Sequence, residues 1–161
     1  MDARSIFLPD LAMVFLTVTI WLRMYVERVA QMRALRVHPQ RLASSAQMSA
    51  ALPDTRAADN FRNLFEVPVL FYLATVVASL IGAVDYMAVV IAWLFVALRY
   101  VHSVIHVTYN RVMHRFTAYV AGCLVLWLLW AKLAIDLDYL ARRSFWSDVV
   151  LIVRTATALF R

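Results

Sequence analysis

The stretch RAADNFRNLFEVP, residues 56 to 68, joins a polar segment to the start of a long apolar run. Its polar side chains recur at spacings of four, three and three residues: Arg56, Asn60, Asn63 and Glu66. This spacing places them along one face of an α-helix. The fifteen residues that follow, 67 to 81, carry no formal charge, so Glu66 lies at the mouth of a hydrophobic segment. A carboxylate there raises the free energy of the inserted helix unless it is paired, solvated or bound to a ligand, so Glu66 is a candidate site residue.

The composition indicates an integral membrane protein. Hydrophobic residues make up 64% of the 161, and only two are glycine. The mean hydropathy of +0.73 lies outside the range of soluble globular domains. The net charge of +6 comes from arginines in short blocks between apolar runs, which is typical of membrane orientation and argues against nucleic-acid binding. The single cysteine, Cys123, excludes an internal disulfide.

The apolar runs predict an all-α, up-down-up-down bundle of four membrane-spanning helices within residues 1–138. The expected helices cover about residues 8–30, 55–82, 85–111 and 115–136. Residues 32–55 are expected to form a solvated loop, with Asp54 or Thr55 as the cap of the second helix. A very short turn at Gly82 makes the second and third helices antiparallel neighbours. The tail, residues 139–161, is too short to span and predicts an interfacial or docking helix over residues 149–160.

The distribution of basic residues predicts the orientation of the bundle. The face with the first and third loops carries nine: Arg23, Arg28, Arg33, Arg36, Arg41, Arg56, Arg62, Arg111 and Arg115. The other face carries six: Arg4, Lys132, Arg142, Arg143, Arg154 and Arg161. Since cytoplasmic loops are enriched in arginine and lysine, loops 31–54 and 111–115 are expected to be cytoplasmic.

A second polar face is expected on the third helix. Its members follow at spacings of three, four and three: Arg99, His102, His106 and Tyr109. Arg99 lies about 20 Å into the bilayer from the start of the helix, which brings it to the same half as Glu66. The two polar faces therefore predict a cavity or a polar interface in that half. The excess of arginines favours an anionic ligand with carboxylates.

Simpler interpretations of the same residues remain open. Glu66 and Arg99 could form a structural ion pair, Asn60 and Asn63 could be interhelical hydrogen-bonding groups, and the residues near the third loop could anchor the helices at the headgroups. A metal site at His102 and His106 is disfavoured, because the chain has only four histidines and Arg99 would repel a cation. We therefore predict no metal.

The pattern Arg-x-x-x-Asn-x-x-Asn-x-x-Glu-x-Pro, followed on the third helix by Arg-x-x-His, resembles the MAPEG family, the membrane-associated proteins in eicosanoid and glutathione metabolism. The likeness covers about residues 8 to 136 and is strongest to small bacterial members. It implies a homotrimer of four-helix bundles in the bacterial inner membrane, with glutathione held between subunits as cosubstrate.

The resemblance also implies roles for individual residues. Arg56, Asn60, Asn63, Glu66, Arg99, His102, His106 and Tyr109 would contact glutathione, with His106 where many members have tyrosine. Arg111 or Arg115 would stabilise the thiolate, since a nearby guanidinium favours the ionised sulfur. The expected activity is a glutathione transferase or peroxidase acting on a lipophilic small molecule. The alternatives are a non-catalytic lipid- or thiol-binding protein, and a structural protein whose Glu66/Arg99 face only holds helices together.

Overall fold

The computed structural model describes residues 3–142, and these are helical apart from short connections. Four helical segments are long and apolar enough to cross a membrane: Arg4–Leu35, Arg56–Leu80, Tyr86–Val107 and Val112–Arg142. In chain order the elements are η1 (Ala3–Ile6), α1 (Phe7–Ala34), η2 (Pro39–Leu42), α2 (Ser45–Ala51), α3 (Arg56–Asn63), α4 (Val67–Leu80), α5 (Tyr86–Val107) and α6 (Val112–Arg142). The prediction of an all-α, four-span membrane bundle is confirmed.

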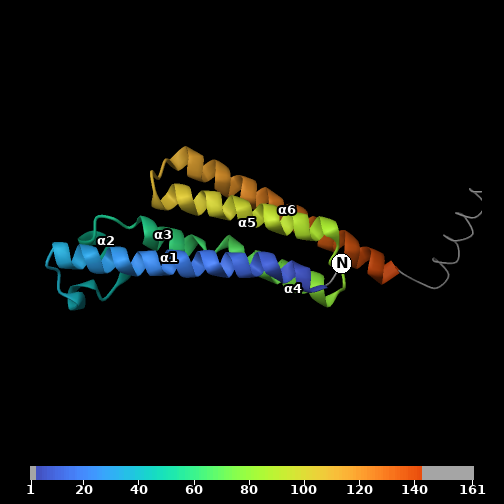
Figure 1. Cartoon of the computed structure of the whole chain (residues 1–161), viewed down its shortest axis with the longest axis horizontal. Coiled ribbons are helices and arrows are strands. Elements are labelled where there is room, and N and C mark those ends of the chain that lie inside the picture. Colours follow the sequence, from blue (N-terminus) through green and yellow to red (C-terminus); the bar gives the residue numbers. More distant parts are fainter. Residues whose placement is uncertain (1–2, 143–161) are drawn as a thin grey trace, which may run out of the picture.

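The helices form two long pairs that lie side by side (Figure 1). One pair is α5 and α6, and the other is α1 with α3 and α4. Small residues along α4 and α5, such as Ala78 and Ala92, are fully buried and allow close approach of the helices. Phe71 of α4 stacks on Phe95 of α5 with ring centres 4.6 Å apart. Because lipid supplies no hydrophobic drive between helices, this close packing holds the bundle together.

The second span is two helices rather than the single helix expected over residues 55–82. α3 ends at Asn63 and α4 begins at Val67, with a turn between them. Pro68 lies in the first turn of α4 and is buried. A proline has no N–H to donate to the carbonyl four residues earlier, and its ring crowds that carbonyl, so the helix breaks before it. The break changes which way the side chains after Asn63 face.

The turn at Gly82 is present as expected. Gly82 has φ +69° and ends α4, with the N–H of Ala83 bonded to the carbonyl of Ala78 at 2.9 Å. Asp85 then caps α5, its carboxylate accepting from the N–H of Ala88 at 2.7 Å. Lys132 of α6 bonds the same carboxylate at 3.0 Å and Asp136 at 2.6 Å. This end of the bundle is therefore closed by a lysine between two aspartates.

The segment expected as a solvated loop contains two short helices. α2 begins with a capping box, in which Ser44 and Gln47 exchange side-chain and backbone hydrogen bonds. Gln31 ties the segment to α1 by bonding both the N–H and the carbonyl of Asp54 at 2.9 Å. Asp54 accepts from the N–H of Arg56 at 3.1 Å, so it caps α3, while the side chain of Thr55 makes no capping bond.

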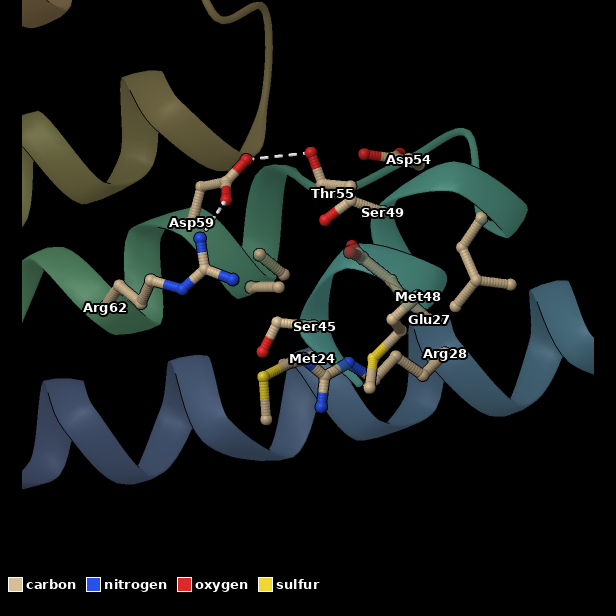
Figure 2. Close-up of a pocket in the computed structure, with 13 residues that line it drawn as sticks. Met24, Glu27, Arg28, Ser45, Met48, Ser49, Asp54, Thr55, Asp59 and Arg62 are labelled. Carbon is tan, nitrogen blue, oxygen red and sulfur yellow. Dashed lines mark hydrogen bonds and ion pairs between the residues drawn. The ribbon is translucent and has the colours of Figure 1, made fainter. Parts of the chain in front are cut away.

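The hollow between α1, α2 and α3 is too small for a ligand (Figure 2). Its walls include Met24, Met48 and Asp59, and Asp59 accepts hydrogen bonds from Thr55 and Arg62 at 2.7 and 3.4 Å. The space inside is about 30 Å³, room for about two or three water molecules. We therefore place no binding site there.

At the C-terminal end, α6 continues to Arg142, beyond the expected end near residue 136. The helix expected over residues 149–160 lies outside the described residues.

Candidate functional site

Arg99 is the centre of the polar region. It is fully buried in the middle of α5, and its Nη2 donates to the carbonyl of Asn63 at 2.7 Å. That carbonyl is the last of α3, left free by the break before Pro68. The guanidinium carbon also lies 5.5 Å from the ring centre of Tyr119. Within residues 3–142, Nε and Nη1 of Arg99 have no hydrogen-bond partner, so this charge is only partly satisfied.

Glu66 and Arg99 do not form the ion pair that the sequence allowed. Glu66 is exposed, and among the described residues its carboxylate makes no ion pair or hydrogen bond. The physical reason is the break between α3 and α4. Glu66 is the N-cap of α4, with φ −97° and ψ −102°, and no longer follows the helical face of Asn60. The interpretation of this pair as the contact that holds two helices together is wrong.

A groove of about 300 Å³ lies between the α3–α4 break and the α5–α6 corner. It is lined by Asn63, Glu66, His102, Val112, Arg115, Phe116 and Tyr119. Arg99 lies directly behind this wall, since it contacts both Asn63 and Tyr119. The groove therefore combines one exposed carboxylate, one guanidinium at the surface, one buried behind it, and two apolar side chains.

Two histidines hold Arg115 in place. Nδ1 of His102 lies 3.1 Å from the carbonyl of Arg115, and since a carbonyl only accepts, Nδ1 carries the proton. Nε2 of His106 lies 3.2 Å from Nη1 of Arg115 and must accept from it. Nη1 also donates to the side chain of Asn110 at 2.7 Å. Both histidines are buried, so they fix the backbone and the guanidinium of Arg115 relative to α5.

Asn60 faces α5 rather than the groove. It is fully buried, and its Oδ1 accepts from the hydroxyl of Ser103 at 3.2 Å. The contact is an interhelical hydrogen bond of the kind that holds membrane helices together. Of the two asparagines, only Asn63 lines the groove.

Arg56 caps the end of α5. Its Nη1 donates to the carbonyl of Thr108, and Arg23 of α1 donates to the neighbouring carbonyl of Val107 at 2.7 Å. Cations are favourable at helix C-termini, where carbonyls lack helical partners. Arg56 also bonds Asp54 at 2.6 Å, and this hydrogen bond holds the pKa of the Asp54 carboxyl at about 2, below its ordinary value. Arg56 does not line the groove.

The remaining predicted residues, Tyr109 and Arg111, are exposed and do not line the groove. The hydroxyl of Tyr109 lies 3.3 Å from Nδ1 of His114. Three groove residues were not predicted from the sequence: Val112, Phe116 and Tyr119. Phe116 and Tyr119 lie in a run that was counted only as apolar. Tyr119 could have been found from its spacing, because it follows Arg115 by one helical turn and therefore lies on the same helix face.

Among residues 3–142, no group of three or more histidine, cysteine or acidic side chains could hold a metal ion. The fold and groove together define a four-span helical membrane protein with a groove beside one end of its third span, lined by one carboxylate, one guanidinium and several apolar or aromatic side chains.

The family model of the MAPEG family matches residues 6–135, and the chain belongs to this family. Neither the comparison with curated proteins nor that with solved structures gave a match. Membership indicates an integral membrane protein with a glutathione-related function in general terms.

Proposed function

We propose that the chain binds glutathione in the groove and transfers it to a lipophilic electrophile. The observation that carries this proposal is the set of unsatisfied charges: Arg99 is buried without a carboxylate, and Glu66 is exposed without a cation. Burying an unpaired ion costs several kcal/mol, so such a residue is expected to have a function. Glutathione carries both kinds of partner: a carboxylate for the guanidinium of Arg99 and an ammonium group for Glu66, which leaves Arg115 for the thiol.

Arg115 is the better candidate of the two arginines for stabilising the thiolate. It lines the groove and is held by His106 and Asn110, whereas Arg111 is exposed outside it. A free thiol has a pKa of about 8.5 and is mostly protonated at neutral pH, and a fixed guanidinium favours the ionised form. The thiolate sulfur then attacks the electrophilic carbon, a C–S bond forms, and the leaving group departs with its electron pair.

The apolar part of the groove suits the second substrate. Val112 and Phe116 line it, and the surrounding surfaces of the spans are apolar and exposed. A lipophilic compound dissolved in the bilayer would reach the sulfur from that side. Reduction of a lipid peroxide by the same thiolate is the related activity, and saturable glutathione binding without thiolate formation is the non-catalytic alternative.

We also propose that the protein is a homotrimer in the bacterial inner membrane, with loops 31–54 and 111–115 in the cytoplasm. The groove is open on one side, and a neighbouring subunit would complete it. A cross-linking series in detergent, read as monomer, dimer and trimer bands, tests the assembly.

Thiolate formation tests the function directly. Purified protein titrated with glutathione should show thiolate absorbance near 240 nm, which Arg115→Ala abolishes. Arg111→Ala is the matched control, because it removes the same charge from the same corner but outside the groove. If the two variants behave alike, Arg115 does not stabilise the thiolate. If the unmodified protein binds no glutathione, the proposal fails as a whole.

A further inference from the structure

Two hollows on the C-terminal part of α1 share residues and form one continuous surface, which has no lining residue in common with the proposed glutathione groove. The first, of about 400 Å³, is lined by Tyr25, Val26, Val29, Ala30 and Arg33. The second, of about 460 Å³, is lined by Val29, Met32, Arg33, Arg36, Val37, His38 and Pro39. Both include Val29 and Arg33, so a shallow, open apolar strip along the helix leads into a basic end. We call this surface the α1 hollow.

The basic end of the α1 hollow has no acidic partner. Arg33 and Arg36 are exposed, and within the described residues neither makes an ion pair. No carboxylate lines either part of the hollow. The nearest acidic residues along the chain are already used, since Glu27 binds Arg23 at 2.7 Å and Asp54 binds Arg56 at 2.6 Å. The two guanidiniums are therefore available to an external anion.

The depth of this surface matches a lipid headgroup. α1 has 28 residues, a length of about 42 Å, whereas the hydrocarbon core of a bilayer is about 30 Å thick. Its last turns must therefore leave the core and pass the headgroup layer. The apolar strip, with Tyr25 and Val26, lies nearer the core, and the arginines lie beyond it. An acyl chain and its phosphate would meet these two parts in that order.

The backbone at Arg36 gives an independent indication. Arg36 follows the last turn of α1 and has φ +52°. Its N–H donates to the carbonyl of Arg33 at 3.3 Å, and the N–H of Val37 donates to the carbonyl of Met32 at 3.0 Å. This helix ending favours glycine, because other residues are strained at positive φ. The chain uses Gly82 for the same ending of α4. At the end of α1 it has an arginine instead, which lines the hollow.

We propose that the α1 hollow binds an anionic phospholipid from the leaflet at this end of the bundle. Its phosphate lies between Arg33 and Arg36, and one acyl chain lies along Val26 and Val29. Juxtamembrane basic clusters attract anionic lipids, and an apolar strip beside the arginines favours a lipid over a free anion. The proposal is independent of glutathione binding.

The test is native mass spectrometry of the detergent-solubilised full chain with phosphatidylglycerol and phosphatidylcholine of the same acyl chains. The unmodified protein should retain phosphatidylglycerol preferentially. Each arginine should contribute about fivefold to its affinity, so Arg33→Gln/Arg36→Gln should lose about 25-fold. The matched control is Arg62→Gln/Arg142→Gln, which removes the same charge from two exposed, ion-paired sites outside the hollow and should lose less than about twofold.

Two further measurements make the inference refutable. Arg36→Gly should weaken phosphatidylglycerol binding while raising the unfolding midpoint, because glycine relieves the strain at positive φ. Inorganic phosphate should not compete at millimolar concentration, whereas a free-anion site would be displaced. Equal retention of the two lipids, or equal losses in the arginine and control variants, would overturn the proposal.

Discussion

Replacing Glu66 with glutamine separates a structural role for this carboxylate from a binding role. Glu66 is exposed and, among residues 3–142, forms no ion pair. Surface substitutions of this kind change the free energy of unfolding by about 0.5 kcal/mol or less. Breaking a buried ion pair with Arg99 would instead cost about 3 to 5 kcal/mol. We therefore expect Glu66→Gln to unfold at the same denaturant concentration as the unmodified protein.

The same substitution should weaken glutathione binding. A hydrogen bond between a carboxylate and the ligand's ammonium contributes about 1.5 to 3 kcal/mol, and the open groove favours the lower value. A loss of about 1.5 kcal/mol raises the Kd about tenfold. Unfolding in mixed micelles measures the stability, and isothermal titration calorimetry measures the Kd on the same preparations.

The control is Glu27→Gln, which changes the only other glutamate in the chain. Glu27 binds Arg23 at 2.7 Å away from the groove, so its loss should cost about 0.5 to 1 kcal/mol of stability and leave the Kd unchanged. The reasoning is refuted if Glu66→Gln lowers stability by more than about 2 kcal/mol with an unchanged Kd. An unchanged Kd with unchanged stability would remove Glu66 from the site.

Three other substitutions test other parts of the structure. The ion pair with Arg56 lowers the pKa of Asp54 to about 2, so the stabilisation from this pair is nearly complete above about pH 4 and is lost as the pH falls through about 2. Asp54→Asn should lose about 1 kcal/mol at pH 7, after allowance for solvent screening, and this loss should shrink steadily in pH-dependent unfolding as the pH falls from about 4 towards 2. Lys132→Met removes both ion pairs at the Gly82 end, where the lysine side chain is 14% exposed, and should lower the free energy of unfolding by about 1 to 2 kcal/mol; no loss would show that these pairs contribute nothing. Gly122→Ala places a methyl group 3.8 Å from Cδ of Arg99, an ordinary contact, and should stabilise α6 by about 0.5 to 1 kcal/mol, whereas destabilisation would show that Arg99 needs the space.

The helix break before Pro68 could be predicted from the sequence, but its effect on the contacts of Asn63 and Glu66 could not. A proline after thirteen helical-looking residues predicts a break, and the expectation of one helix over residues 55–82 overlooked it. The break frees the carbonyl of Asn63 and moves Glu66 off the polar face. That Arg99 would take the free carbonyl, rather than pair with Glu66, depends on how α5 is rotated against α3.

The choice between Arg111 and Arg115 is a similar case. Both are near the corner before α6, and their sequence positions do not distinguish them. In the structure the histidines of α5 hydrogen-bond to Arg115 and not to Arg111, through the backbone carbonyl of Arg115 and one of its guanidinium nitrogens. Tyr119 joins the site because α6 packs along α5 and brings its first turns beside Arg99.

The amino-acid sequence by itself determined the membrane class, the four spans, the turn at Gly82 and the candidate polar residues, because hydrophobic length and helical period are local properties of a chain. Only the tertiary structure decided which polar residues share the groove, which ones cap helices or join them, and that Glu66 stays unpaired. Those outcomes depend on the relative rotation and depth of neighbouring helices, which are set by close packing between residues far apart in the chain.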